Sequence, residues 1–287
     1  MAATLFLSLV SFVLWLVDPR GPSAVFGGAA LALVYGITME RRWIAWTRRI
    51  ITLPGLPRQL DGLRLVHITD LHWDVYTNAA RMHAVFDEIT ALKPDLVVLT
   101  GDLITHYRRH IDPCTDALAR LRARLGVFAV LGNHDHWASG RLVTDALRKR
   151  GVHVLVNEHV LVDGGLWLVG VDDPHLQFSD LDKALDGIAD DDGRPRLLLA
   201  HSPDIMAEAE GRVDVVLTGH THGGQVSFPV VGPLLRATRR EAGRSFVQGM
   251  KRAGSTLCFT NRGLGTVLIP IRFNCRPEVA VITLRSS

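Results

Sequence analysis

Short apolar runs that end in glycine or polar residues recur along most of the chain and predict buried β-strands. Between several of them lie segments whose apolar residues are spaced as on one face of a helix. Strands that alternate with helices are typical of an α/β domain. The pattern predicts strands at residues 63–69, 96–100, 127–131, 152–156, 160–162, 166–171, 196–200, 213–218, 256–260 and 278–284. It predicts helices at residues 79–92, 114–125 and 141–150.

Two uncharged apolar segments, residues 4–17 and 21–39, precede this pattern. As helices they would be ~21 and ~28 Å long at ~1.5 Å per residue, against a hydrocarbon core of ~30 Å. Three interpretations are open: a helical hairpin through the membrane, a single anchor formed by the second segment, and a cleaved signal peptide. A signal peptide needs a positive charge ahead of its apolar run, and no Lys or Arg precedes Arg20.

A basic and aromatic cluster follows the second apolar segment. Trp43 and Trp46 are interleaved with arginines, which is typical of a membrane interface. The arginines are Arg41, Arg42, Arg48 and Arg49. The positive-inside rule places them, and the domain that follows, in the cytoplasm. We therefore expect residues 1–49 to anchor the chain at the cell inner membrane and residues 50–287 to form one catalytic domain with its own core.

Composition narrows the class of partner. The net charge of +3 and a pI near 9.0 favour anionic partners such as phosphates or acidic lipids. The three cysteines show no CxxC spacing, which argues against a disulfide framework. The chain lacks the aromatic and basic platform that single strands need, so we expect no nucleic-acid partner.

Polar residues with metal-binding side chains follow five of the predicted strands. Because ligands of open α/β sheets bind at the carboxyl ends of strands, we expect these side chains to meet. They are Asp70, His72, Asp102, Asn133, His201, His220 and His222. Oxygen and imidazole ligands without thiolate suit Mn²⁺, Fe or Zn²⁺. Seven ligands are too many for one tetrahedral ion and suit two ions about 3.5–4 Å apart that share a carboxylate.

The order of these blocks resembles that of the calcineurin-like metallophosphoesterases. The resemblance covers residues 62–285 and rests on the blocks Asp70-x-His72, Gly101-Asp102, Gly132-Asn133-His134-Asp135, His201 and Gly219-His220-Thr221-His222. Flanking residues resemble a membrane-anchored bacterial subgroup, which is similar to phosphodiesterases linked to UDP-2,3-diacylglucosamine hydrolysis in lipid A biosynthesis. These flanks are Leu56-Pro57, Asp61-Gly62, Gly223-Gly224-Gln225, Asn261-Arg262-Gly263-Leu264-Gly265 and Pro277-Glu278.

The resemblance implies a fold and a division of roles. The fold would be a four-layer α/β/β/α sandwich, here preceded by the N-terminal membrane helices. One metal ion would be held by Asp70, His72, Asp102 and His222, and the other by Asp102, Asn133, His201 and His220. Asp102 would bridge the two ions. The catalytic pair would be His134, held by Asp135, which would stabilise the phosphoryl oxygens or protonate the leaving group.

The chain is therefore expected to be a dinuclear-metal phosphoesterase that hydrolyses a phosphodiester or pyrophosphate bond at the membrane surface. Mn²⁺ is the expected metal, with Fe or Zn²⁺ as alternatives. The expected substrate is a phosphoester, and one candidate is the lipid-linked UDP-2,3-diacylglucosamine. The alternatives are a phosphoprotein or nucleotide phosphatase, a nuclease, and a non-catalytic metal-binding membrane scaffold. A scaffold needs neither His134 nor Asp135, so their presence favours the enzyme.

Two further stretches are candidates for substrate contact. The most basic segment, residues 236–252, follows the apolar stretch 228–235 and is either a solvated loop or a loop that faces acidic headgroups and presents a lipid-linked phosphoester. Several residues near the blocks are candidates to grip phosphate or to line the cleft, and a solvated loop is the alternative for those at residues 106–110. The candidates are His106, Arg108, Arg109, His110, His136, Trp137 and His175.

Overall fold

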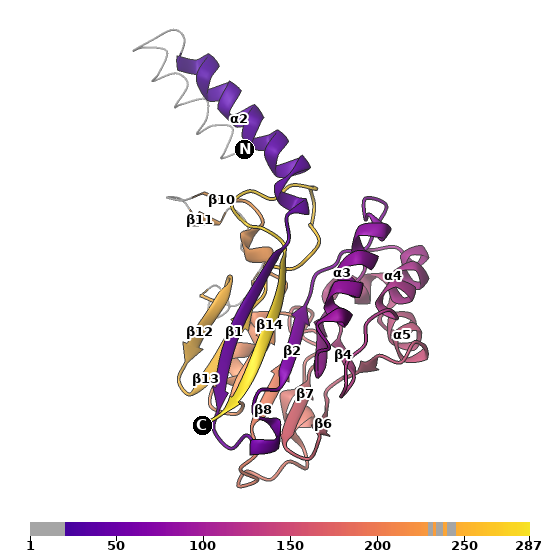
Figure 1. The fold of residues 1–287 in the computed structure, drawn as a ribbon, viewed down its shortest axis with the longest axis vertical. Helices are drawn as coiled ribbons and strands as arrows, with labels where there is room; N and C mark the ends of the chain where they lie inside the picture. The colour runs from indigo at the N-terminus through magenta and orange to yellow at the C-terminus, as the bar shows by residue number, and fades with distance from the viewer. Residues whose placement is uncertain (1–20, 229–231, 234–237, 240–244) are drawn as a thin grey trace.

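Two six-stranded mixed sheets form the body of the protein (Figure 1). The computed structural model describes residues 21–228, 232–233, 238–239 and 245–287. The first predicted apolar segment, residues 4–17, therefore lies outside the described residues. So do Arg236, Arg240 and Arg244 of the predicted basic segment.

The first sheet carries the first three ligand blocks. Its order is β1 (Ala45–Leu53), β14 (Glu278–Ser286), β2 (Arg64–Ile68), β3 (Leu96–Thr100), β4 (Val127–Val130) and β5 (His153–Val154). Strands β2 to β5 are parallel, with Val66 opposite Val97 and Val97 opposite Val127. Strand β14 is antiparallel to β2 and parallel to β1. The carboxyl ends of β2, β3 and β4 consequently lie at one edge of this sheet.

The second sheet carries the remaining blocks. Its order is β12 (Gly249–Ala253), β13 (Thr256–Thr260), β9 (Val215–Thr218), β8 (Arg196–Leu199), β7 (Leu166–Gly170) and β6 (Glu158–Val162). The four central strands are parallel, and both edge strands are antiparallel to their neighbours. Strands β8 and β9 thus end at the same edge of the sheet.

The sheets pack face to face and are covered by helices on their outer faces. One core cluster joins Leu65, Leu96 and Phe128 of the first sheet to Leu197 and Leu217 of the second. Since successive strand residues face opposite ways, the alternate residues of each strand pack outward.

The outward-facing residues form two further clusters. The outer face of the first sheet packs against α3 (Ala79–Ala91), α4 (Ile111–Leu118) and α5 (Asn133–Lys149), with Phe86 and Leu147 as buried helix residues. That of the second packs against α6 (Leu181–Leu185) and α7 (Met206–Ala209). The fold is therefore an α/β sandwich of four layers, as predicted. Single turns of 3₁₀ helix are η1 (Glu40–Arg42), η2 (Arg58–Leu60), η3 (Arg108–His110), η4 (Pro203–Ile205) and η5 (His222–Gly224), and a small pair of strands is formed by β10 (Ser227–Phe228) and β11 (Gly232–Pro233).

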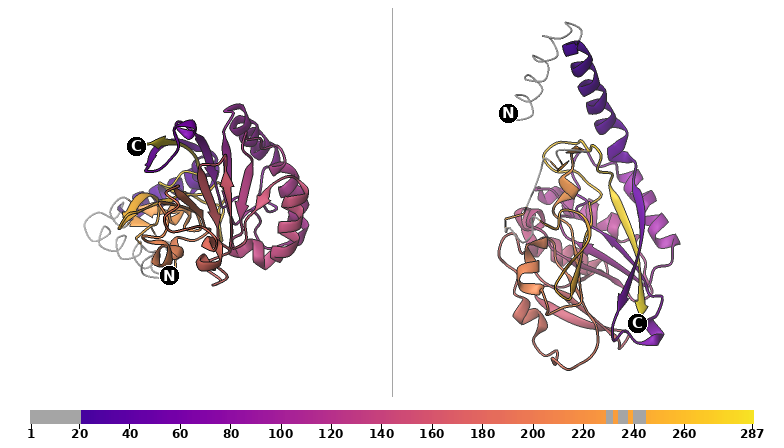
Figure 2. Two further views of the ribbon diagram at one scale, coloured as in Figure 1. Left: turned by 90° about the horizontal axis from the view of Figure 1, so that it is seen from below. Right: turned by 90° about the vertical axis from the view of Figure 1, so that its left-hand side faces the viewer.

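Helix α2 (Gly21–Thr38) covers most of the second predicted apolar segment and projects away from the sandwich (Figures 1 and 2). Within the described part of the chain, no helix combines the length and the apolar character needed to cross a membrane. The last turns of α2 contact the sandwich at residues 271–272, where Arg272 N–H donates to the carbonyl oxygen of Gly36 at 3.3 Å.

The segment that was interpreted as a membrane interface is largely a strand. Trp46, Arg48 and Arg49 lie in β1, which pairs along its whole length with β14. The strand was missed because it is an edge strand whose outer positions carry exposed Trp, Arg and Ile side chains. The expected domain boundary between residues 49 and 50 falls inside this strand.

Three other predictions differ from the structure. Helix α4 occupies residues 111–118 rather than 114–125, and it includes Pro113 because proline is tolerated in a first helical turn. Helix α5 begins at Asn133 rather than near residue 141. Its two parts are separated by a non-helical Ser139, and only the second part has a clear helical pattern. Lys251 and Arg252, assigned to a basic loop, lie in edge strand β12.

Candidate metal centre

The seven predicted ligands lie at the carboxyl ends of β2, β3, β4, β8 and β9, and all are buried. Backbone hydrogen bonds join the loops that carry them. Asp70 N–H donates to Gly101 O and His72 N–H to Asp102 O, both at 3.0 Å, and Gly219 N–H donates to His201 O at 2.9 Å. The fold therefore brings all seven side chains to one place between the two sheet edges.

Five of the seven have backbone conformations that are uncommon for residues other than glycine. Asp70, His72, Asp102, His220 and His222 have φ between 45° and 67°. A non-glycine residue in the left-handed region is uncommon, and such strain concentrates at functional sites. The backbone at these strand ends thus adopts an unfavourable conformation that turns the side chains toward a common point.

The first ligand group consists of Asp70, His72 and His222. The Nε2 atoms of His72 and His222 are 2.9 Å apart, and His222 Nε2 lies 3.4 Å from Asp70 Oδ1. Two imidazole nitrogens that face each other at this distance, with a carboxylate beside them, provide the donor atoms of a cation site.

The second ligand group consists of Asp102, His201 and His220. His201 Nε2 lies 3.2 Å from Asp102 Oδ2 and 3.0 Å from His220 Nδ1. The same Asp102 Oδ2 is 3.5 Å from His72 Nε2 of the first group. Asp102 therefore faces both groups, which is the position of a bridging carboxylate.

The residues present fit a pair of divalent ions. Asn133 Oδ1 is buried and has no hydrogen-bond donor among the described residues, as a neutral ligand oxygen would have. The remaining donors are carboxylate oxygens and imidazole nitrogens, without thiolate. This donor set suits Mn²⁺, Fe or Zn²⁺.

Burial and charge act together on the titratable groups. Burial raises the pKa of Asp70 to about 7. The attraction of His201 acts to lower this pKa, and the repulsion of Asp102 acts to raise it. Burial also works to raise the pKa of Asp102, but the attraction of His201 and His72 outweighs it and leaves that pKa well below its usual range. Burial acts to lower the pKa of His201. The charge of Asp102 and its hydrogen bond to His201 outweigh burial and raise that pKa well above its usual value. A buried carboxylate such as Asp70 gains its charge most easily when a cation is bound beside it.

The predicted pairing of His134 with Asp135 is wrong. His134 Nδ1 lies 2.7 Å from the carbonyl oxygen of Thr105, which fixes the ring through an N–H donated to that carbonyl. Asp135 is fully buried and instead accepts the backbone N–H groups of Gly132, Leu103 and Ile104 at 3.0–3.1 Å. The carboxylate points back into the strand ends because it lies in the first turn of α5. Asp135 thus organises the loop after β3 rather than the imidazole.

Close approach of backbones requires glycine at two positions. A Cβ atom on Gly132 would lie 2.3 Å from Asp102 Oδ1 and 2.6 Å from Asp102 N. One on Gly219 would lie 2.3 Å from Asp70 Oδ2 and 2.2 Å from Thr69 Oγ1. Each glycine lets one ligand loop pack against a carboxylate of another.

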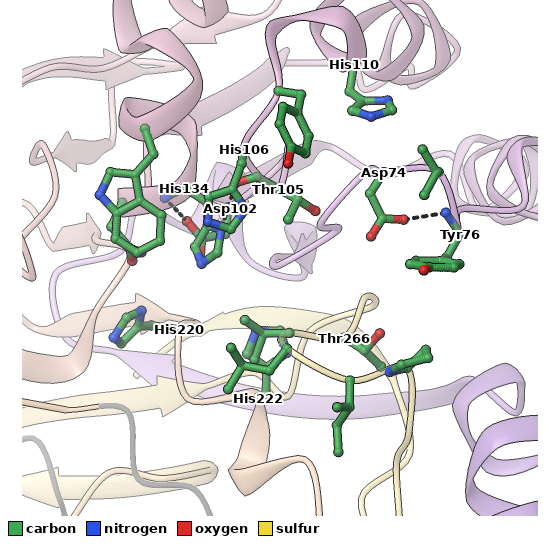
Figure 3. A pocket seen from close by; sticks show the side chains of 18 of the residues that line it. Asp74, Tyr76, Asp102, Thr105, His106, His110, His134, His220, His222 and Thr266 are labelled. Carbon is green, nitrogen blue, oxygen red and sulfur yellow. Dashed lines mark hydrogen bonds between the residues drawn. The ribbon is translucent and has the colours of Figure 1, made fainter.

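The ligand groups open into a cleft of about 1040 Å³. Figure 3 shows His220 and His222 facing His134 and Asp102 across it. Trp137 stacks on His106 with 5.3 Å between ring centroids, and His106 contacts His134 at 4.6 Å. These rings form one wall of the cleft around His134.

The other residues proposed to line the cleft divide into two groups. Arg109, His110 and His175 line it, and His175 packs 4.6 Å from His220. Arg108 instead donates to the carbonyl of Ala138, and His136 Nε2 pairs with Asp172 at 2.6 Å. These last two side chains bind neighbouring structure rather than facing the cleft.

An apolar rim of the cleft was not predicted. It consists of exposed or partly exposed side chains from three loops: Val75, Tyr76, Tyr107, Val267, Leu268, Ile269 and Pro270. Leu268 is 86% exposed. The only signal in the sequence was the apolar stretch 267–271 between glycines and polar residues, which is also the pattern of a buried strand.

Arg272, fully buried, is a second residue that was not predicted. Its guanidinium donates to the carbonyls of Arg262, Gly263, Gly265 and Cys275. The loop that Arg272 holds is hydrogen-bonded to the loop that carries Asp70: Leu264 N–H donates to Thr69 O, and Gly265 N–H donates to Asp70 O. Arg272 therefore helps to hold the first ligand loop in place.

Comparisons with known proteins agree with this site. The family model described as calcineurin-like phosphoesterase matches residues 63–224. The uncharacterized metallophosphoesterase YkuE of Bacillus subtilis (strain 168) is 32% identical over 262 residues, which cover 88% of this chain and 90% of that protein. An uncharacterized metallophosphoesterase of Aquifex aeolicus (strain VF5) is 33% identical over 254 residues, covering 86% and 94%. The phosphodiesterase YaeI of Escherichia coli (strain K12) is 29% identical over 242 residues, covering 77% and 82%.

Fold, ligand groups and relatives together define a metallophosphoesterase, a hydrolase of phosphoester bonds. The chain belongs to the calcineurin-like phosphoesterase family. Its members' fold implies divalent metal ions, and the candidate ligand groups provide places for them.

Proposed function

We propose that the protein is a dinuclear-metal phosphodiesterase or pyrophosphatase and that Mn²⁺ is its preferred metal. The observation that carries this is the position of Asp102, whose carboxylate lies between the two ligand groups. One ion would be held by Asp70, His72, Asp102 and His222, and the other by Asp102, Asn133, His201 and His220. When bound, the ions would act as Lewis acids that activate water and neutralise charge on the phosphate.

His134 is the candidate for proton transfer. Its Nδ1 is bound to the Thr105 carbonyl, which leaves Nε2 for the substrate. Burial lowers the pKa of His134, which favours the neutral ring in the free protein. An anionic phosphate beside the ring favours the protonated form, which can then donate to the leaving-group oxygen. Asp135 contributes by fixing the backbone at Leu103 and Ile104, ahead of Thr105.

We further propose that the substrate is amphiphilic and is taken at a membrane surface. The apolar rim of the cleft is continuous along the chain with Ile271, which packs beside Gly36 of α2. Strand β14 pairs with β1 on one side and with β2 on the other. Its Glu278 pairs with Ala45 at the start of β1, and its Ala280 pairs with His67 near the end of β2, so the start of β1 lies beside the end of β2. Helix α2 (Figure 1) and the strand ends that carry the ligand groups thus lie at the same end of the sandwich. This supports a substrate whose acyl chains stay in a bilayer, and UDP-2,3-diacylglucosamine belongs to this class.

The location that follows from this proposal is the cytoplasmic face of the inner membrane. Arg41, Arg42, Arg48 and Arg49 follow α2, and arginines beside an apolar segment favour the cytoplasmic side. We also propose that the basic segment 236–252 contacts lipid headgroups. Of the four arginines at positions 236, 239, 240 and 244, Arg239 lies in the described residues.

A substrate panel tests the proposed function. The purified full-length protein with Mn²⁺ is compared on four compounds: bis(p-nitrophenyl) phosphate, p-nitrophenyl phosphate, UDP-2,3-diacylglucosamine in mixed micelles, and the same nucleotide sugar without its acyl chains. We expect the diester to be hydrolysed faster than the monoester, and the lipid-linked pyrophosphate faster than the same nucleotide without acyl chains. Faster hydrolysis of the monoester would favour a phosphatase. Binding of metal without turnover of any phosphoester would favour a scaffold.

A further inference from the structure

A second cavity, of about 310 Å³, adjoins the metal cleft. His72 of the first ligand group lies in its wall, and Asp74, Tyr76 and Thr266 line both the cavity and the cleft. Figure 3 shows Tyr76 and Thr266 at the end of the cleft away from His220. Small-molecule sites have volumes of roughly 300–1,000 Å³, so the cavity is large enough for a phosphate group with its immediate substituent.

Three arginines line this cavity, which we call the arginine pocket: Arg41 and Arg42 from η1, and Arg81 from the first turn of α3. Arg81 Nη2 donates to the carbonyls of Arg42 at 2.7 Å and Arg41 at 3.4 Å, which holds the two elements together. Burial and the positive charges of Arg42 and Arg41 lower the pKa of Arg81. The structure therefore places like charges side by side, at a cost in free energy that a bound anion would offset.

Within the described part of the chain, none of these three arginines forms an ion pair. Arginines elsewhere commonly do, as in the pairs Arg120–Asp87, Arg124–Asp95 and Arg150–Asp116. Arg41 Nε is buried and has no hydrogen-bond acceptor. The carboxylate of Asp74, also in the wall, accepts the Tyr76 N–H at 2.7 Å and the Thr77 hydroxyl at 3.4 Å.

The backbone adds to the positive potential. Thr77 and Asn78 in the wall precede α3, and Asn78 caps this helix of 13 residues by accepting the Arg81 N–H. The N-terminus of a helix carries partial positive charge and directs N–H groups outward, which favours anions. Guanidinium groups present two parallel N–H donors that match the oxygens of phosphate.

We propose that the arginine pocket binds a phosphate group other than the one that is hydrolysed. That group is either a second phosphate of the substrate, which rests on the proposed function above, or the headgroup phosphate of a membrane lipid, which does not. In either case the pocket would hold the anion beside the metal cleft and next to the end of α2.

Phosphate binding tests the pocket itself. Inorganic phosphate is titrated by calorimetry into the full-length protein in EDTA, so that the metal centre does not contribute. The variant is Arg41→Gln/Arg42→Gln, and the control is Arg48→Gln/Arg49→Gln on β1, which removes the same charge from exposed positions. We expect binding to weaken at least about ten-fold in the variant, as for lost charge-assisted hydrogen bonds, and to be unchanged in the control. Equal affinity in the variant and the wild type would overturn the proposal.

Two further arms distinguish the source of the phosphate. The first compares Mn²⁺-loaded wild type and variant on the p-nitrophenyl 5′-phosphodiester of thymidine, with and without a phosphate on its 3′ oxygen. A lower KM for the substrate with the extra phosphate, lost in the variant alone, identifies a substrate phosphate. The second measures sedimentation with vesicles of phosphatidylglycerol and phosphatidylcholine. Weaker binding of the variant to phosphatidylglycerol vesicles, with unchanged kinetics, identifies a lipid headgroup.

Failure of the proposed function has a different signature. Wild type that hydrolyses neither thymidine substrate would refute the phosphodiesterase assignment, while the phosphate affinities measured in EDTA would still decide whether the pocket binds an anion.

Discussion

Asp102 is the residue on which both ligand groups depend. One of its oxygens lies within 3.5 Å of ring nitrogens from both groups, and the other accepts the His134 N–H at 2.9 Å. It therefore connects the two sets of donors and the start of α5, and the loss of its charge affects all three.

Asp102→Asn should abolish binding of both metals and lower turnover of bis(p-nitrophenyl) phosphate by at least ~100-fold, since even residues that merely support ligands contribute ~10–100-fold. Metal content by mass spectrometry and steady-state kinetics measure the two effects. Asp87→Asn, which removes a carboxylate from an exposed ion pair, is the matched control and should behave as wild type. Two metals per chain with normal turnover in Asp102→Asn would refute the bridging role.

His134→Ala should leave metal content near that of wild type and lower kcat by ~10²–10⁴-fold, the range typical of general acid–base catalysis. His83→Ala on α3 is the control. His134 also lies close enough to His72 and Asp102 to hold a metal ion with them. If metal content falls together with activity, His134 is a metal ligand.

At the scale of secondary structure, the strands that carry the site were the most predictable elements. Val97, Val98 and Leu99 form a fully buried apolar run, and such runs end where polar ligands begin, so β3 was identified within its correct bounds. The edge strands β1 and β12 were missed because their exposed side chains interrupt the pattern.

Long-range contacts explain the errors within the site. Proximity in sequence indicated that Asp135 holds His134, but three backbone N–H groups from the ends of β3 and β4 compete for that carboxylate. The apolar rim and the brace by Arg272 depend on loops that meet only in the folded chain. Residue types at strand ends predicted which candidate ligand side chains meet, whereas the hydrogen bonds that position them join segments far apart in the sequence.

The junction between β4 and α5 gives an element-scale prediction. Gly132→Ala should displace the Asp102 loop, because the added Cβ would lie within 2.6 Å of two Asp102 atoms. We expect weaker metal binding, and destabilisation of about 1–3 kcal/mol as is usual for overpacking. Calorimetric metal titration and urea unfolding measure these effects. Gly28→Ala on α2, where an added Cβ meets nothing within 4 Å, is the control, and equal behaviour of the two variants would show that the close approach is not needed.

For the molecule as a whole, stability and metal binding are linked through buried carboxyl groups. The pKa of Asp70 is raised to about 7 in the folded protein, from 3.8 as the ordinary value. The folded, metal-free protein thus holds this proton more tightly than the unfolded chain. Its contribution to stability is lost as pH rises through that window. A bound cation requires the ionised carboxylate and competes with the proton.

The rise in Tm produced by Mn²⁺ should therefore grow as pH increases from about 5.5 to about 8. Differential scanning calorimetry with and without Mn²⁺ at several pH values measures it. A rise in Tm that does not change with pH, or that shrinks as pH increases, would show that Asp70 does not bind metal as the carboxylate.

If two metal ions bridged by Asp102 make this protein a phosphodiesterase, its turnover depends on both ions. The most direct measurement is reactivation of metal-stripped protein, with hydrolysis of bis(p-nitrophenyl) phosphate followed as Mn²⁺ is added in known ratio to protein. We expect no turnover without metal and full turnover only when two ions are bound per chain. Full turnover in the stripped protein, or after a single ion is bound, would contradict this expectation.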